Sequence, residues 1–307
     1  MGATLISTPG HRLTDRVPPL LLPGDPDLRR FHRIIVHTSA GKDSTALLEV
    51  VVTLAHYAGV LDRVVVAHAD LGVMDWKGTS ALAALHAEAY QLRFEQRRRK
   101  GGNLLEAVQE RGKWPGPTTR WCTSGFKRDT LAPLITQLAD EARAAGQVKE
   151  GAAQILNVMG MRAQESTSRA RRPRLALDRR ASSGRRHVWT WLPLLHFPVE
   201  AVWEVVHATG LPYHWVYDHG LSRASCSLCP LAAKADLTRA ILMRPQHAQA
   251  HAVVEADIGH RFRADLSIED LIEQVSRGDI DERHPRPTRG GRQGAHASRT
   301  ISKYLYN

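Results

Sequence analysis

A short apolar run that stops at small residues and leads into a helix-like segment constrains this chain most. The run from Ile34 to His37 is rich in β-branched residues and ends at Ser39-Ala40-Gly41. Lys42-Asp43-Ser44 then opens a segment from Thr45 to His56 whose apolar residues recur with helical spacing. A strand, a tight turn and a helix N-terminus together offer backbone N–H groups and a positive dipole end to an anion. The stretch therefore predicts a phosphate-binding site, with Lys42 and the hydroxyls of Ser39, Ser44 and Thr45 as further donors.

Apolar runs and helical patterns alternate along the following 180 residues or so. The predicted strands span residues 33–37, 63–68, 93–96, 153–160 and 187–194. The predicted helices span residues 45–56, 79–92, 103–110, 128–145 and 198–209. The remainder to Arg277 predicts a small C-terminal helical cap.

Composition divides the chain into four parts. We expect a flexible leader at 1–30, one α/β domain at 31–232, the helical cap at 233–277 and a basic tail at 278–307. The sequence contains no run of about 18 apolar residues, so no membrane span is expected. The N-terminal part lacks the apolar core of a signal peptide, and the cytoplasm is the expected compartment. The net charge of +11 favours a polyanionic partner.

Polar motifs follow two of the predicted strands, and a third precedes a predicted helix. Asp70 ends the second strand, where nucleotide sugars or bases bind in such units, although Asp-Leu-Gly is equally typical of a turn. Gly160, Arg162 and Arg169 follow the strand at 153–160 and suggest anion handling. Lys127 precedes the helix at 128–145, just after Trp121-Cys122.

Two segments are unusually rich in arginine. Residues 97–100 have the sequence Arg-Arg-Arg-Lys, and we expect this run either to be exposed to solvent or to contact phosphates. Residues 171–186 predict a flexible basic loop that orders on a phosphate-rich partner.

Ser39-Ala40-Gly41-Lys42-Asp43-Ser44 resembles the Ser-Gly-Gly-Lys-Asp-Ser loop of the PP-loop ATP-pyrophosphatase superfamily, with one Gly→Ala change. It differs from the Walker loop, which has four residues between Gly and Gly-Lys-Ser/Thr. Three more blocks, which are 68–72, 120–127 and 160–169, narrow the resemblance to the branch that is similar to phosphoadenosine-phosphosulfate (PAPS) reductases. The loop 217–230, with its Cys-x-x-Cys, resembles more narrowly the DNA-phosphorothioation ATPase subunit.

This resemblance implies an adenine nucleotide α-hydrolase fold of Rossmann type, a parallel sheet flanked by helices with ATP at the carboxyl ends of the strands. It implies cleavage of ATP between the α- and β-phosphates to adenylate a substrate. The implied pyrophosphate ligands are Ser39, Gly41, Lys42, Asp43 and Ser44. Asp70 and Gly160 would lie near the nucleotide, while Lys127, Arg162 and Arg169 would neutralise phosphate or sulfate oxygens. The implied Mg²⁺ would bridge the phosphates with Asp43 as a possible ligand.

The three cysteines are an odd number, which argues against a disulfide framework. If Cys122, Cys226 and Cys229 converge, they could hold a [4Fe–4S] cluster with one open iron, one cysteine short of the usual four. The alternatives are zinc bound by these cysteines and His214 or His219, or no metal at all, with Cys122 as a core residue. A cluster predicts that the Cys-x-x-Cys loop folds back over the nucleotide site.

Three functions remain open at this point. The first is ATP-dependent sulfur transfer to nucleic acid, DNA above all, which implies a sulfur-donor protein such as a cysteine desulfurase. The second is a PAPS reductase or sulfotransferase, which the absence of any cysteine after Cys229 disfavours, since the reductases use a C-terminal Glu-Cys-Gly thiol. The third is a non-catalytic module that binds nucleotide or nucleic acid.

Overall fold

The computed structural model describes residues 24–279, and six strands in this part form one sheet. The strand order is β3-β2-β1-β4-β6-β5, and all neighbours are parallel except β5, which runs antiparallel to β6. The strands are β1 Arg33–Thr38, β2 Val64–Asp70, β3 Arg93–Arg98, β4 Ala153–Val158, β5 Leu175–Leu177 and β6 Arg186–Trp191. The predicted α/β class and the five predicted strands are confirmed, and β5 was not foreseen.

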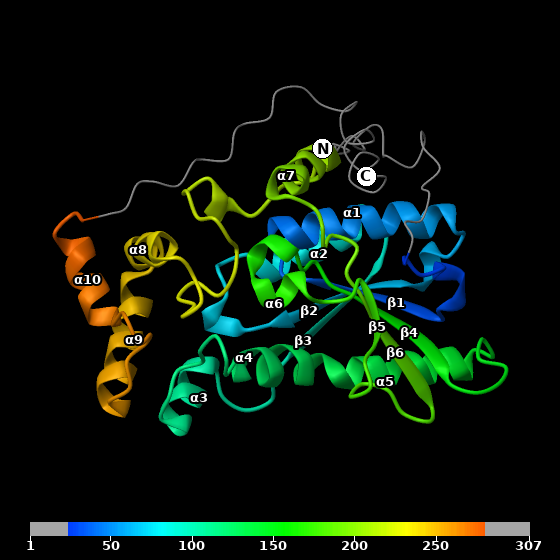
Figure 1. Cartoon of the computed structure of the whole chain (residues 1–307), viewed down its shortest axis with the longest axis horizontal. Coiled ribbons are helices and arrows are strands. Elements are labelled where there is room, and N and C mark those ends of the chain that lie inside the picture. The colour runs from blue at the N-terminus through cyan, green and yellow to red at the C-terminus, as the bar shows by residue number, and fades with distance from the viewer. Residues whose placement is uncertain (1–23, 280–307) are drawn as a thin grey trace, which may run out of the picture.

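Helices cover both faces and one end of the sheet (Figure 1). They are α1 Lys42–Tyr57, α2 Thr79–Ala89, α3 Leu104–Arg111, α4 Trp121–Thr123, α5 Asp129–Ala144, α6 Thr167–Ala170, α7 Val199–Thr209, α8 Lys234–Met243, α9 Pro245–Ile258 and α10 Ile268–Ser276. Between α4 and α5 the chain makes a π-helical turn, Ser124–Arg128. Among residues 24–279, none of these helices is long and apolar enough to cross a membrane.

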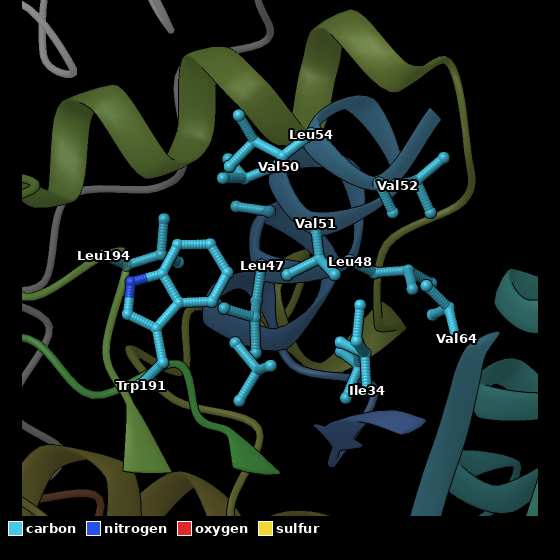
Figure 2. Close-up of a cluster of buried hydrophobic side chains, with 14 of the residues drawn as sticks. Ile34, Leu47, Leu48, Val50, Val51, Val52, Leu54, Val64, Trp191 and Leu194 are labelled. Atoms are coloured by element: carbon cyan, nitrogen blue, oxygen red, sulfur yellow. The ribbon is translucent and has the colours of Figure 1, made fainter. Parts of the chain in front are cut away.

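Alternate residues of β1 supply the two halves of the core. Ile34 and Val36 pack with α1 and α7 on one face, in the cluster that also holds Trp191 (Figure 2). Ile35 points the other way and packs with α5. Because side chains of a strand alternate between faces, an unbroken run such as Ile34-Ile35-Val36 suits a sheet that is covered on both sides.

The basic segment at residues 171–186 is not the flexible loop that its composition predicted. It forms β5 and the turn into β6, and the Asp178 carboxylate accepts the backbone N–H groups of Arg180 and Ala181 at 3.0 and 3.1 Å. Arg186 pairs with Ala153 at the start of β4. The turn directly before β6 therefore lies at the amino edge of the parallel strands, while Arg180 in the same hairpin lies 3.6 Å from Asp129 at the start of α5.

The C-terminal helices α8, α9 and α10 gather at the carboxyl end of the sheet (Figure 1). Their core is shared with distant parts of the chain, because Trp76, Trp114 and Tyr217 are buried in the same cluster. The predicted leader and tail lie largely outside the described residues. Within the described part of the leader, Leu28 is buried in the cluster of α1 and α7.

Candidate active site at the carboxyl edge of the sheet

The loop between β1 and α1 is shaped by hydroxyl groups of its own. Ser44 Oγ donates to the carbonyl of Gly41 at 2.9 Å and accepts the N–H of Ser39 at 3.3 Å. Thr38 Oγ1 accepts the N–H of Ala40 at 3.1 Å. Ala40 is fully buried with φ of +53°, in the left-handed region that favours glycine, at the position where the resembling loops carry glycine.

The first turn of α1 keeps free donors at this loop. Within the described part of the chain, the backbone N–H groups of Gly41, Asp43 and Ser44 have no hydrogen-bond acceptor. Gly160, just after β4, lies against this turn: a Cβ there would stand 3.0 Å from the carbonyl oxygen of Asp43. Only glycine allows so close an approach, so β4 ends beside unpaired N–H groups that suit an anion.

Three charged side chains meet at the start of α1. Lys42 Nζ lies 3.1 Å from Asp43 Oδ2 and donates to the carbonyl of Ser222 at 3.1 Å. Arg162 Nε donates to Asp43 Oδ1 at 2.5 Å. Burial alone would raise the pKa of Asp43, but Lys42 and Arg162 together lower it below its ordinary value. Two cations and one carboxylate leave a net positive charge beside the free N–H groups of the first turn of α1.

The predicted role of Asp43 as a Mg²⁺ ligand does not fit this arrangement. Both carboxylate oxygens of Asp43 already contact cations, Lys42 on one side and Arg162 on the other. A cation placed there would meet two positive charges. Asp43 is instead a residue that positions Lys42 and Arg162.

Glu165 organises a second group of arginines beside the first. Its Oε2 accepts the N–H of Arg162 at 3.0 Å and also pairs with the Arg169 guanidinium. Its Oε1 lies 3.4 Å from the guanidinium of Arg223. The predicted Arg162 and Arg169 are thus brought together, and Arg223 joins them from the loop 217–230. The sequence has no periodic or positional signal that could single out Arg223.

The loop 217–230 folds back over α1, as the cysteine prediction required. The hydroxyl of buried Tyr217 accepts the N–H groups of Lys42 at 2.9 Å and of Ala224 at 3.2 Å. The buried Asp236 on α8 accepts the N–H and hydroxyl of Ser222 at 2.8 and 2.6 Å, and the Ser222 carbonyl holds Lys42. The helical cap is therefore connected to the phosphate loop through Ser222.

Asp70 lies at the end of β2, as predicted, but its carboxylate is fully engaged within the protein. It accepts the N–H of Gly72 at 2.8 Å, the amide of Gln96 at 2.8 Å and the Arg98 guanidinium at 2.6 Å. Burial alone would raise the pKa of Asp70, and these hydrogen bonds lower it. The turn interpretation of Asp-Leu-Gly describes this arrangement, with Arg98 as an added partner.

All three cysteines lie in electrostatic range of Lys127. Cys122 and Cys226 pack on the same small apolar cluster, which includes Phe126. Burial alone would lower the pKa of Lys127, but the neighbouring Cys226, Cys229, Asp75 and Cys122 raise it. Burial raises the pKa of the Cys226 thiol to about 12 and also raises that of Cys229. The Lys127 side chain makes no hydrogen bond or ion pair to any residue between 24 and 279.

The predicted Cys₃His zinc site does not form. Across residues 24–279, no group of three or more His, Cys, Asp or Glu side chains is arranged to hold a single metal ion. His214 is buried, with Nε2 3.0 Å from the Thr79 hydroxyl and Nδ1 accepting the N–H of Val216. A [4Fe–4S] cluster places its cysteines on different iron atoms, so the sulfurs stand farther apart than ligands of one ion. In this part of the chain the three cysteines, each in electrostatic range of Lys127, do not by themselves form a metal site.

Two side chains near the cysteines were not foreseen from the sequence. Asp75, whose pKa is raised by burial, accepts the N–H of Leu71 at 2.9 Å and lies in electrostatic range of Lys127. His68 Nε2 lies 4.0 Å from Asp75 and 3.2 Å from the Ser80 hydroxyl. His68 lies near the end of β2 in the block at 68–72, so its position on the strand was the available signal.

Comparisons with known proteins identify the family of this chain. Residues 33–232 match the phosphoadenosine phosphosulfate reductase domain. An uncharacterized protein of Methanocaldococcus jannaschii is 27% identical over 68% of this chain and 44% of its own length. An uncharacterized 37.8 kDa protein of Escherichia phage 186 is 27% identical over 48% of this chain and 40% of its own length. The chain thus spans less than half of the curated relatives it matches.

Among solved structures, the PAPS reductase from Candida auris in its phosphate complex is similar, with 16% identity and a TM-score of 0.41. The match covers 62% of this chain and 80% of that one. The family model spans most of the sheet, the phosphate loop and all three cysteines. The chain belongs to the phosphoadenosine phosphosulfate reductase domain family.

Proposed function

We propose that this protein cleaves ATP between the α- and β-phosphates and adenylates an acceptor for sulfur transfer. The single observation that carries the proposal is the first turn of α1, where free N–H groups of Gly41, Asp43 and Ser44 lie beside Lys42 and Arg162. Such donors hold pyrophosphate and stabilise the charge that develops on it as it leaves.

The reaction is a substitution at the α-phosphorus. An acceptor oxygen forms a bond to the α-phosphorus, the bond to the bridging oxygen breaks, and pyrophosphate departs with the electron pair. Lys42 and Arg162 offset the charge of pyrophosphate, and Asp43 holds both in place. Arg169 and Arg223, oriented by Glu165, are available to other phosphate oxygens. When a sulfur nucleophile then attacks the adenylated acceptor, AMP is the leaving group.

In this proposal, the three cysteines serve the sulfur-transfer step. Cys122, Cys226 and Cys229 would hold a [4Fe–4S] cluster, whose open iron supplies a binding point for sulfur when the group is bound. Lys127, which has no anionic partner at hydrogen-bonding distance within residues 24–279, would offset the negative charge of the thiolates that such a cluster requires. The proposed acceptor is nucleic acid, with DNA first, and the proposed sulfur donor is a protein such as a cysteine desulfurase.

The test is pyrophosphate release from ATP, measured with and without DNA or RNA. We expect Lys42→Ala to lower the rate about 10²–10³-fold, as for removal of one electrostatic group at a transition state. Lys149→Ala, at an exposed lysine before β4, is the matched control and should keep the wild-type rate. A Lys42→Ala enzyme with wild-type turnover would remove the phosphate-site assignment.

A second candidate, reduction or transfer of sulfate from PAPS, is favoured by the family match itself. It predicts tighter binding of PAPS than of ATP and no pyrophosphate release. Titration calorimetry with both nucleotides separates the two enzymes. Binding of a nucleotide with no turnover under any acceptor would instead identify a non-catalytic module.

A further inference from the structure

A basic surface adjoins the cysteine group at the carboxyl edge of the sheet. Four residues define it, and we name them the arginine face: Arg98, Arg99, Lys100 and Arg111. The first three follow one another at the end of β3, and Arg111 ends α3. All four are exposed.

Two of these arginines are held in place by aromatic rings. The Arg99 guanidinium lies 4.3 Å from the centre of the Phe126 ring, and the Arg111 guanidinium lies 5.0 Å from that of Trp121. The two rings themselves are 6.4 Å apart. A guanidinium over an aromatic face keeps its charge and most of its donors while losing freedom, so less entropy is lost when an anion binds.

The charge of this surface is mostly uncompensated. Within residues 24–279, no ion pair involves Arg99, Lys100 or Arg111. Arg98 pairs with Asp70, and its side chain is still 66% exposed. A surface whose cations have no internal partner is suited to an external anion.

The position of the arginine face connects it with the proposed chemistry. Trp121 and Phe126 bracket the turn that carries Cys122 and lead directly to Lys127. Asp70 and Arg98 are paired at the carboxyl ends of β2 and β3, the same sheet edge as the phosphate loop. Arg180 of the β5–β6 hairpin lies 3.6 Å from the Asp129 carboxylate at the start of α5, whereas the exposed Arg30 and Lys149 precede β1 and β4 and lie at the amino edge.

We infer that the arginine face binds the phosphodiester backbone of a nucleic acid and leads that strand to Cys122 and Lys127. The inference rests on the proposed function for the choice of acceptor, and the location rests on the contacts above. Guanidinium groups pair with phosphate oxygens in a fixed fork, and several of them along one face match a repeating anion. The arginine-rich hairpin is then not the main contact.

The test is binding of a fluorescein-labelled DNA duplex of about 30 base pairs, and of one of its strands alone, followed by anisotropy at several salt concentrations. The Arg99→Glu/Arg111→Glu variant should bind at least about tenfold more weakly at about 100 mM salt, and the slope of log K against log salt should fall by about 2. Arg99→Gln/Arg111→Gln should lie between this variant and the wild type. Thermal melting confirms that each variant is folded.

The matched control is Arg30→Glu/Lys149→Glu, which changes the net charge equally at the opposite edge of the sheet, where these two exposed residues precede β1 and β4. It should keep the wild-type slope. Equal weakening by both pairs would overturn the inference, because the effect would then be one of total charge. Wild-type binding in Arg99→Glu/Arg111→Glu would overturn it as well, as would tight binding of poly-glutamate with none of either DNA form.

Pyrophosphate release from ATP, measured on the same proteins with and without DNA or RNA, keeps the two proposals distinguishable. If wild type binds DNA through the arginine face but never releases pyrophosphate, the docking surface holds and the adenylation proposal fails. If pyrophosphate is released but DNA binding does not depend on these arginines, the adenylation proposal holds and the docking surface fails.

Discussion

At the scale of single residues, the site depends on very close packing around the first turn of α1. Ala40 occupies a left-handed backbone position, and Gly41 lies against the Tyr217 hydroxyl, so that a Cβ added at Gly41 would stand 3.1 Å from that oxygen. Asp43 and Glu165 are surrounded by cations and serve to orient them. The residues that shape the loop and orient its cations are therefore as important for the site as the cations and N–H groups that would contact an anion.

Gly160→Ala tests this packing. Its Cβ would meet the backbone carbonyl of Asp43 at 3.0 Å, and neither backbone can move freely, so we expect a loss of about 1–3 kcal/mol in the free energy of unfolding. ATP affinity should fall too, since α1 must shift. Denaturant titration and calorimetry measure both quantities. Gly184→Ala is the control, because nothing lies within 4 Å of that Cβ and no change in ATP affinity is expected.

At the scale of elements, one loop joins the phosphate site, the cysteine pair and the helical cap. Tyr217 contacts α1, Ser222 contacts both Lys42 and α8, and Cys226 and Cys229 follow within the same loop. Ser227 also donates its N–H to the carbonyl of Met74, which ties the loop to the segment after β2. A change at one of these anchors is therefore expected to reach the others.

Tyr217→Phe removes the acceptor of two buried N–H groups, those of Lys42 and Ala224. Leaving a buried donor without a partner costs about 1–3 kcal/mol, so the free energy of unfolding should fall by at least that amount. Urea titration provides the measurement. Tyr213→Phe removes a hydroxyl that bonds Asp218 at an exposed position and should cost much less. Equal losses in both variants would contradict the proposed anchoring role.

At the scale of the whole molecule, the cap carries two neighbouring histidines, His251 fully buried and His247 half-buried. His247 and His251 lie one turn apart on α9 with ring centres 4.4 Å apart, and their Nε2 atoms are buried without a partner among the described residues. Burial lowers the pKa of His247 to about 3 and that of His251 to about 4. Both rings are therefore neutral in the folded protein at neutral pH.

Acid should destabilise the protein through this pair. Below pH 6.5 the unfolded chain takes up protons that the folded chain refuses, so stability is complete above that pH and is lost as pH falls toward 4. The loss is about 1.4 kcal/mol per pH unit for each histidine. Urea midpoints measured at neutral pH and at successively lower pH values follow it. His251→Phe should lower the measured slope by about 1.4 kcal/mol per pH unit, while His260→Gln, at an exposed position, should leave it unchanged.

Much of the fold could be predicted from local pattern. The strand-turn-helix signal at residues 33–56 and the alternation that follows depend on near neighbours in the chain, and the structure confirms both. β5 was missed because three residues of strand carry too little periodicity, and its arginine-rich flanks are typical of a loop. The hairpin is held by Asp178 and by pairing with β6, neither of which composition can reveal.

Contiguous motifs were enough to predict the class of the fold, the position of the phosphate loop and the candidacy of Lys42, Arg162 and the cysteines. Which of these residues meet depended on the three-dimensional packing. It turned Asp70 toward Arg98, placed Arg223 on Glu165 and gathered Cys122 with Cys226 and Cys229 around Lys127. The physical reason is that these contacts join residues that lie dozens to over a hundred positions apart, and such partners are selected by the packing of the sheet and its loops rather than by local spacing.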